Sequence, residues 1–265
     1  MFKNPIFARM SNGTFSGNIK LAILGGGQLG KMILTKCRQW DVYTKVLDHS
    51  PNAPAQLLAD DFSVGDLMDY QTVVDFGKDA DVITIEIENV NIEALHSLQK
   101  LGKKVYPKPE TLEIIQSKAK QKQFYADHNI PTSAHKTYSQ KPAWDSLKLP
   151  CVWKASRFGY DGFGVKKIET QSDWASVPDV PCIVEDCVAI AKEIAVIVAR
   201  KETGECVSYP PVEMEFHNQS NQVEYVFTPS TLDKKQRTSS QVLAEQVAHK
   251  PVSYTHLRAH ETILD

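Results

Sequence analysis

KLAILGGGQLG, residues 20–30, joins an apolar run to a glycine-rich turn. The first five residues, KLAIL, are typical of a strand that is buried on both faces of a sheet. The turn that follows matches the pattern G-x-G-x-x-G, and apolar residues then recur at helical spacing from Leu29 to Trp40. Strand, glycine turn and helix in this order predict the first unit of a parallel α/β sheet.

The alternation of strands and helices continues along the first 110 residues. Further strands are predicted for TKVLD (44–48), DVITIEIEN (81–89) and KKVYP (103–107), and helices near 69–77 and 91–100. Residues 1–18 are polar and rich in Gly, Ser and Asn, which predicts a flexible leader. We therefore expect a Rossmann-like α/β domain with a parallel sheet over residues 19–110.

The pattern changes in the second half of the chain. A helical segment begins at Pro109 and continues to His128. Short strands separated by turns follow from residue 150, namely CVWKA, VKKI, CIVED, EIAVIVA and CVSYP. Together with a helix predicted at 239–250, they indicate an α+β domain over 111–250 with an antiparallel lid. The last stretch, PVSYTHLRAHETILD (251–265), supplies no apolar face, and we expect an unrelated tail there.

Composition excludes several classes of protein. The 265 residues carry a net charge of -2, without the overall basic field that is expected of a nucleic-acid-binding protein. The five cysteines are irregularly spaced, which favours free thiols in a reducing compartment over a disulfide framework or a zinc site. No apolar run approaches the ~18 residues of a membrane span. A cytoplasmic protein without nucleic-acid or membrane partners is the expectation.

The first glycine turn leaves two interpretations open on its own residues. Gly25, Gly27 and Gly30 after a strand, with Asp48 at the end of the next one, fit a nicotinamide-binding fold in which the acid holds a ribose. An NAD(P)-dependent oxidoreductase is therefore one alternative. The other is a tight turn between strand and helix that binds no ligand.

A second glycine loop, SRFGYDGFG (156–164), lies between two strands. Such a loop suits a flap that places backbone N–H groups over a triphosphate, and Lys154 at the end of the entering strand would add a positive charge. Glu185 and Glu193 lie where the other wall of a nucleotide pocket would hold adenine and ribose. Considered singly, the loop could equally be an ordinary hairpin with a solvated lysine, and each glutamate an exposed acid on an edge strand.

Six motifs in this order resemble one family: GGGQLG (25–30), TIEIENV (84–90), QSKAKQKQF (116–124), IPTSAH (130–135), KASRFGYDGFG (154–164) and CIVED…KEIAVIV (182–198). The chain is similar over about residues 19–250 to the 5-(carboxyamino)imidazole ribonucleotide synthetase family of ATP-grasp enzymes. The resemblance implies a pre-ATP-grasp domain followed by an incomplete ATP-grasp domain. It also implies a ligase that uses ATP, bicarbonate and 5-aminoimidazole ribonucleotide in purine biosynthesis, with Mg²⁺ as cofactor and a homodimer as a possible assembly.

The resemblance assigns roles to individual residues. Tyr160 and Asp161 would face the reacting centre, where Asp161 would orient the attacking amine or accept its proton. The acceptor substrate would lie at Gly27, Gln28 and either Glu86 or Glu88. The remaining implied positions contact ATP: Lys118, Lys154, Gly159, Tyr160, Asp161, Gly162, Phe163, Gly164, Val165, Glu185, Asp186, Cys187, Val188, Glu193 and His217.

The chain departs from the family pattern at three places. Lys118 stands where the family usually has Arg, which keeps the charge but loses the bidentate fork. Phe163 replaces another frequent Arg. The family's Mg²⁺ ligands fall beyond the matching region, so no residue of this chain is assigned to the metal. We therefore expect the chain as written to be catalytically inactive, and a nucleotide-binding fragment without catalysis is the third alternative.

Overall fold

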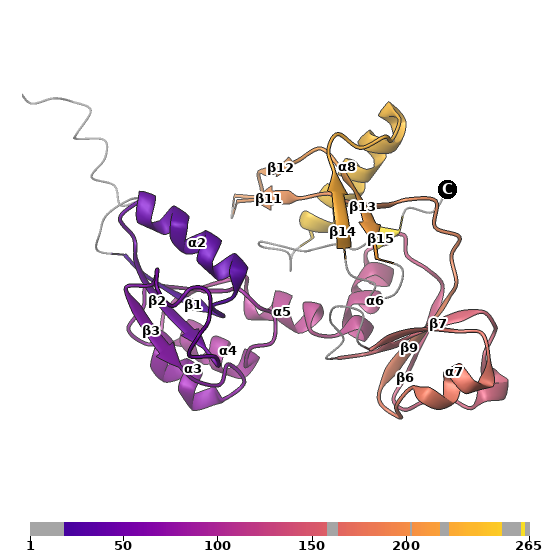
Figure 1. Ribbon diagram of the computed structural model, residues 1–265, viewed down its shortest axis with the longest axis horizontal. Coiled ribbons are helices and arrows are strands. Elements are labelled where there is room, and N and C mark those ends of the chain that lie inside the picture. The colour runs from indigo at the N-terminus through magenta and orange to yellow at the C-terminus, as the bar shows by residue number, and fades with distance from the viewer. Residues whose placement is uncertain (1–18, 158–163, 202, 218–222, 251–260, 263–265) are drawn as a thin grey trace, which may run out of the picture. The chain divides into compact units, whose positions relative to one another are not determined.

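A computed structural model describes residues 19–157, 164–201, 203–217, 223–250 and 261–262. The chain divides into two compact units, residues 1–109 and 110–265 (Figure 1). The predicted leader, residues 158–163 of the second glycine loop and most of the predicted tail lie outside the described residues. In the part of the chain that is described, no helix is both long and apolar enough to cross a membrane.

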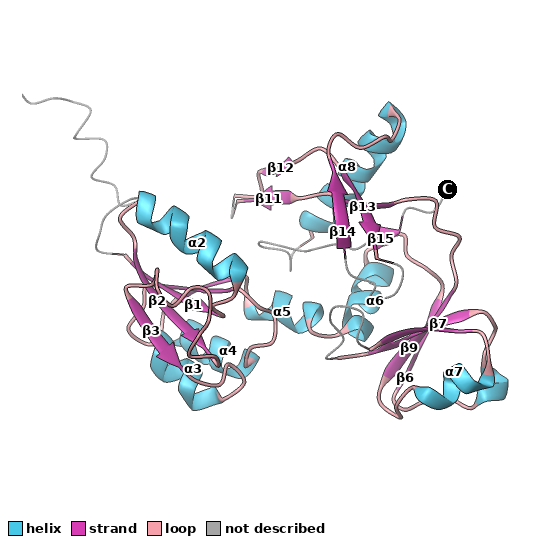
Figure 2. Ribbon diagram, in the orientation of Figure 1, coloured by secondary structure: helices cyan, strands magenta, loops and turns pink. Residues whose placement is uncertain are grey.

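The N-terminal unit is built on a five-stranded parallel sheet with the strand order β3-β2-β1-β4-β5. Its helices and strands are visible in Figure 2. In chain order they are β1 (Lys20–Leu24), α2 (Gln28–Gln39), β2 (Tyr43–Asp48), β3 (Asp61–Val64), α3 (Tyr70–Gly77), β4 (Val82–Ile85), α4 (Ile92–Lys100) and β5 (Lys104–Tyr106). The predicted parallel α/β architecture is confirmed.

The apolar strands place the core of this unit on both faces of the sheet. Helix α2 lies on one side of the sheet and α3 and α4 on the other (Figure 1). Leu34 of α2 packs with Ile23 and Val46. Helices α3 and α4 are in close contact, because a Cβ added to Gly77 would lie 2.6 Å from Leu98 Cδ1. Burial on both faces explains why β1 reads as a continuous apolar run.

Two features of this unit differ from the sequence prediction. Strand β3 was not predicted, because its sequence DFSV is short and only partly buried at the edge of the sheet. The strand predicted for 81–89 ends at Ile85, after which the chain bends. The bend leaves the TIEIENV motif half in the sheet and half in a loop, with Glu86 as the first residue of that loop.

The C-terminal unit is an α+β structure with antiparallel strands. One sheet has the order β6-β9-β7-β8, a second has the order β14-β13-β10-β15, and β11 pairs with β12. Its elements in chain order are α5 (Pro109–Ile115), α6 (Lys118–Asp127), β6 (His135–Tyr138), a 3-10 turn (Trp144–Ser146), β7 (Cys151–Ala155), β8 (Val165–Ile168), α7 (Gln171–Ser176), β9 (Cys182–Asp186), β10 (Glu193–Ala195), β11 (Val198–Arg200), β12 (Cys206–Ser208), β13 (Val212–Phe216), β14 (Val223–Phe227), α8 (Lys234–Ala248) and β15 (Glu261–Thr262).

Capping explains where the helices of this unit differ from the prediction. The helix expected over 109–128 is two helices, because Ser117 caps α6 by accepting a hydrogen bond from the Lys120 N–H. Helix α8 begins at Lys234, five residues before the predicted start, because Asp233 and Gln236 form a capping box. Strand β15 lies in the stretch predicted to be an unrelated tail, and it pairs with β10.

Candidate functional site

The sheet β6-β9-β7-β8 separates an apolar face from a polar one. Side chains alternate along a strand, so Cys151, Trp153 and Ala155 of β7 point to one face and Lys154 to the other. The first three are buried with Trp174 of α7 and form the core of this part of the molecule. Lys154 and Glu185 therefore meet on the face opposite that core, and these two residues anchor the candidate site.

The polar face carries an ion pair that is largely shielded from water. Lys154 Nζ lies 2.9 Å from Glu185 Oε2, and their side chains are 28% and 7% exposed. The Ser133 hydroxyl donates a further hydrogen bond of 2.9 Å to the same carboxylate oxygen. The lysine is thus the more exposed of the two partners, and an incoming ligand would reach it first.

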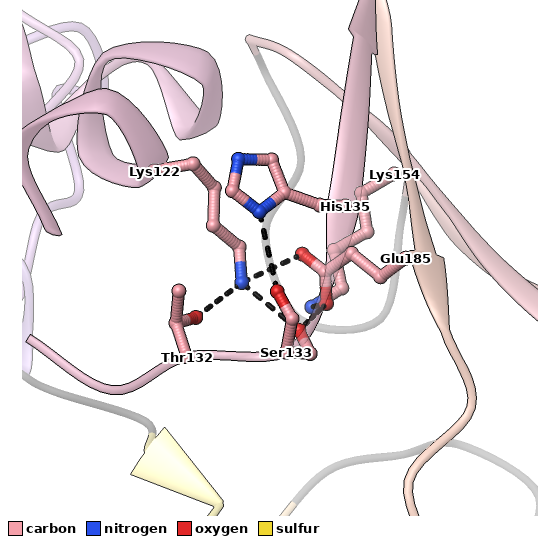
Figure 3. A network of polar contacts seen from close by, with 6 residues as sticks. All are labelled: Lys122, Thr132, Ser133, His135, Lys154 and Glu185. Atoms are coloured by element: carbon pink, nitrogen blue, oxygen red, sulfur yellow. Dashed lines mark hydrogen bonds and ion pairs between the residues drawn. The ribbon is translucent and has the colours of Figure 1, made fainter. Parts of the chain in front are cut away.

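A second lysine reaches the same carboxylate from helix α6. Lys122 Nζ lies 3.3 Å from Glu185 Oε1 and its side chain is 11% exposed. The same ammonium donates hydrogen bonds to the hydroxyls of Thr132 and Ser133. Figure 3 shows Lys122, Lys154 and Ser133 around Glu185, with Thr132 beside the Lys122 ammonium. The carboxylate thus has two cationic partners, one from the sheet and one from the helix.

These partners control the charge of Glu185. Burial by itself would raise the pKa of this carboxyl, but Lys154, Lys122 and the Ser133 hydroxyl outweigh it and hold the pKa below its ordinary value. Glu185 is therefore ionised at neutral pH. The site is a buried anion whose charge two lysines compensate.

Helix α6 is attached to the strand that carries Lys154. The Lys118 N–H donates a 2.9 Å hydrogen bond to Ser156 O, and the hydroxyls of Ser117 and Ser156 are 3.5 Å apart. On the other side of the second glycine loop, the Ala155 N–H donates to Gly164 O at 2.8 Å. Gly164 has φ +73°, a left-handed conformation that favours glycine. The two ends of the glycine loop are thus held beside Lys154.

Lys122 and Ser133 were not among the site residues predicted from the sequence. A lysine in the polar helix QSKAKQKQF is usually solvated, and a serine after a proline is usually a turn residue. The only available signal was the presence of both inside motifs that resemble the family. Their role depends on contacts across 10 to 63 positions, such as Ser133 to Glu185, and no local pattern contains them.

The other predicted nucleotide contacts are distributed over two sheets. Asp186 ends β9 and makes an exposed ion pair with Lys148, while Cys187 and Val188 follow the strand and are half-buried. Val165 begins β8 directly after the glycine loop, in register with Lys154. Gly159, Tyr160, Asp161, Gly162 and Phe163 lie outside the described residues.

Glu193 and His217 belong to the second sheet. Glu193 begins β10 opposite Met214 of β13, and burial raises the pKa of its carboxyl above the ordinary value. His217 follows β13 directly and is exposed. A register shift between Glu215 and Phe216 distorts β13 just before this histidine.

A third carboxylate, Glu213, lies on the face of this sheet opposite Glu193. It accepts a hydrogen bond of 3.0 Å from the Thr231 N–H and is bound by the ammonium of Lys192. Chiefly the hydrogen bond from Lys192, and then that from Thr231, lower the pKa of Glu213 to about 2. Because Glu193 and Glu213 are on opposite faces, they do not converge on one ligand. Among the described residues, no three His, Cys, Asp or Glu side chains form a group that could hold a metal ion.

In the N-terminal unit, backbone donors of the first glycine turn are already used within the protein. The Gly25 N–H donates to Leu47 O at 2.9 Å, and the Gly26 N–H donates to Asp48 Oδ2 at 2.7 Å. Gly25 has φ +103°, which favours glycine. Asp48 also accepts a 2.8 Å hydrogen bond from the Ser50 N–H. Asp48 is thus a buried brace of the turn, which does not fit the ribose acid of the nicotinamide alternative.

Glu86 lies directly against this turn. A Cβ added to Gly27 would lie 2.6 Å from Glu86 Oε1, and one added to Gly25 would lie 2.7 Å from Oε2. The turn and Glu86 follow β1 and β4, neighbouring strands at the point where the strand order reverses. Glu88 and Gln28 are exposed, whereas Glu86 is half-buried. A carboxylate at this position favours hydroxyl or amine donors over a pyrophosphate.

Two family models match the chain, one for each part. The ribonucleotide synthetase preATP-grasp domain matches residues 19–116, and the ATP-grasp domain matches residues 123–255. The second match continues past residue 250, where the resemblance seen in the sequence was expected to end. These matches give the nicotinamide alternative no support.

Relatives and solved structures agree with these matches. A phosphoribosylaminoimidazole carboxylase of Candida albicans is 32% identical over 238 residues, which are 85% of this chain and 42% of that protein. The crystal structure of N5-carboxyaminoimidazole ribonucleotide synthetase from Thermotoga maritima has 33% identity and a TM-score of 0.77, and the match covers 87% of this chain and 61% of that one.

A third comparison is with a structure that contains ligands. N5-carboxyaminoimidazole synthase from Aspergillus clavatus, in complex with ADP and 5-aminoimidazole ribonucleotide, has 25% identity and a TM-score of 0.77, covering 88% of this chain and 63% of that one. The chain thus spans less than two thirds of the length of these relatives. The two matched domains show that the chain belongs to the ATP-grasp family, with a ribonucleotide synthetase preATP-grasp domain before the ATP-grasp domain.

Proposed function

We propose that this chain binds ATP and that its family's reaction is the ATP-dependent carboxylation of 5-aminoimidazole ribonucleotide with bicarbonate, while the chain as written is expected to be inactive. In this reaction ATP phosphorylates bicarbonate to carboxyphosphate, and the exocyclic amine of the ribonucleotide takes up the carboxyl group as phosphate leaves. The observation that carries the proposal is the pair Lys154–Glu185, whose lysine is partly exposed and lies on the strand that leads into the second glycine loop. The bound ADP of the Aspergillus relative supports the same assignment.

The roles of individual residues form part of this proposal. Lys118, Lys154, Gly164 and Val165 lie at the two ends of the second glycine loop. We propose that they and Gly159 to Phe163 within the loop contact the triphosphate. Residues Glu185 to Val188 would contact the adenine, and Glu193 and His217 would complete the nucleotide site. Tyr160 and Asp161 keep their proposed place at the reacting centre, where Asp161 would serve the attacking amine.

A titration series tests the proposal. We expect the chain to bind ATP and ADP, measured by calorimetry, and to bind NAD and NADP at least about tenfold more weakly, which corresponds to ~1.4 kcal/mol. The expected preference rests on the lysine beside the glycine loop and on Asp48, which already braces the first turn. Binding of NAD that is lost in Gly27→Ala, without binding of ATP, would contradict the proposal and favour the nicotinamide alternative.

Glu86, and not Glu88, is proposed to face the acceptor ribonucleotide. We expect Glu86→Gln to weaken binding of 5-aminoimidazole ribonucleotide roughly tenfold, because a charged acceptor of a hydrogen bond contributes about 1.5–3 kcal/mol. Glu88→Gln is the matched control, since Glu88 lies two residues further along the same loop and is exposed. Equal effects of the two variants on the dissociation constant of the ribonucleotide would contradict this assignment.

Three finer expectations belong to the proposal. Catalysis in this family implies Mg²⁺, but the described residues assemble no set of ligands for it. We therefore assign no metal ligand and derive no step through a metal. A homodimer and a cytoplasmic location remain predictions from the resemblance.

A further inference from the structure

We propose that Lys122 is a positioning residue of the nucleotide site: it keeps the buried Glu185 carboxylate compensated when Lys154 leaves it for the phosphates of ATP. This inference rests on the proposed nucleotide-binding function. It concerns a residue to which the sequence analysis gave no role.

Glu185 is held in its position by the sheet. Its side chain is 7% exposed, and it extends from the middle of the sheet, where β9 is paired on both sides by β6 and β7. Lys154, in contrast, is 28% exposed, and its strand leads into the glycine loop, beside the hydrogen bond from the Ala155 N–H to Gly164 O. When an ATP phosphate attracts this ammonium, the carboxylate stays behind.

The carboxylate that stays behind needs another cationic partner. A buried carboxylate without a cationic partner is strongly unfavourable, and it takes up a proton if no other charge compensates it. Lys122 meets this need, because its ammonium contacts the other oxygen of the carboxylate, Oε1, at 3.3 Å. Lys154 can therefore change partners while Glu185 remains ionised.

Lys122 is held in place independently of Lys154. The hydroxyls of Thr132 and Ser133 both accept hydrogen bonds from its ammonium, and Ser133 also donates one to Glu185. Lys122 itself is 11% exposed, too buried to move out to a ligand in solvent. It is thus suited to compensate the carboxylate and not to bind phosphate.

The other charged groups on this face of the sheet do not replace Lys122. His135 of β6 is the register partner of Glu185, and its Nδ1 lies 3.2 Å from the backbone oxygen of Ser133 (Figure 3). Lys167 of β8 shares the face through its partner Val152, but its ammonium is 2.7 Å from Glu169. Lys122 and Lys154 are the two cations that contact the carboxylate among the described residues.

The experiment measures ATP binding and the protons that accompany it. Calorimetric titrations with ATP at pH 7, in two buffers of different ionisation enthalpy, give the number of protons taken up on binding. We expect Lys122→Met to weaken ATP binding about tenfold and to take up more protons than the wild type. Subtracting the wild-type value removes the contribution of the ionisation of ATP itself. Binding of AMP is expected to change less than threefold, because AMP lacks the phosphates that attract Lys154.

The controls separate positioning from general damage. Lys120→Met removes an exposed lysine of the same helix, which pairs with Glu113, and it is expected to behave like the wild type. The double variant Lys122→Met/Glu185→Gln removes the carboxylate as well, and we expect it to take up no additional protons on ATP binding, because no carboxyl group remains there to be protonated. If Lys122→Met does not fold, Ser133→Ala removes one of the hydroxyls that hold the Lys122 ammonium. We then expect additional proton uptake that is smaller than the uptake expected for Lys122→Met.

Three results would overturn the inference. They are equal losses of ATP and AMP affinity in Lys122→Met, proton uptake in Lys122→Met that is the same as in the wild type, and additional proton uptake that persists in the double variant. A wild-type chain that binds no ATP would instead refute the proposed function. The two ideas therefore fail in distinguishable ways.

Discussion

Replacing Lys154 with methionine is expected to weaken ATP binding by about 10- to 150-fold. The loss corresponds to the roughly 1.5–3 kcal/mol that a hydrogen bond to a charged group contributes. In Lys154→Met, Glu185 keeps Lys122 and Ser133 as partners, so the sheet should retain its structure. Calorimetric titration with ATP, and with AMP as the ligand that lacks the β- and γ-phosphates, measures the effect. AMP affinity should change little.

The chain provides a matched control for this prediction. Lys148 precedes the same strand and pairs with Asp186, the residue that follows Glu185, but this ion pair lies on the surface. Lys148 is 81% exposed, and exposed ion pairs contribute little. Lys148→Met should therefore leave ATP binding unchanged. Equal losses in both lysine variants would show that general charge attracts ATP, whereas no loss in Lys154→Met would place the phosphates elsewhere.

Asp48→Ala is expected to lower the free energy of unfolding of the N-terminal unit by about 3 kcal/mol. The carboxylate is buried and accepts hydrogen bonds from the backbone of Gly26 and Ser50. Its removal leaves two N–H donors without their charged acceptor, one of them in the turn that joins β1 to α2. Urea unfolding followed by circular dichroism at pH 7 gives the change, provided that the dependence on urea concentration keeps the same slope.

Asp66→Ala is the control for the brace formed by Asp48. Asp66 also accepts a hydrogen bond from the backbone two residues ahead, at Met68, but the structure shows for it no partner corresponding to Gly26 among the hydrogen bonds of the described residues. We expect a loss of less than about 1 kcal/mol for this variant. If Asp48→Ala were no less stable than Asp66→Ala and instead lost affinity for NAD, the acid would be a ribose ligand and the turn a dinucleotide site.

Much of the fold follows from local patterns. The apolar run of β1, the glycine turn and the helical spacing after it predict a parallel sheet, because burial on both faces requires such runs. Short strands between turns predict the antiparallel second part. The patterns fail where burial is incomplete, as in β3, and where a cap decides the start of a helix, as at Asp233.

The sequence by itself also indicated candidate residues of the nucleotide site. Lys154 stands out because it lies beside the second glycine loop, and Glu185 because it lies in a motif that resembles an ATP-grasp family. Residue identity alone, however, did not separate Glu86 from Glu88, or an Asp48 that braces a turn from one that binds a ribose. In each case both interpretations are compatible with the same letters at the same spacing.

Only the tertiary structure shows the contacts on which our proposals for these residues rest, because charge and hydrogen bonding depend on distances between segments that are far apart in the chain. Glu86 lies against Gly27 because β1 and β4 are neighbours in the sheet. Lys122 reaches Glu185, 63 positions away, because α6 begins beside β7. The hydrogen bond from the Lys118 N–H to Ser156 O holds the start of the helix there. A lysine that looks solvated in the sequence thus becomes the partner of a buried carboxylate, since burial makes the charge of Glu185 depend on every cation within reach.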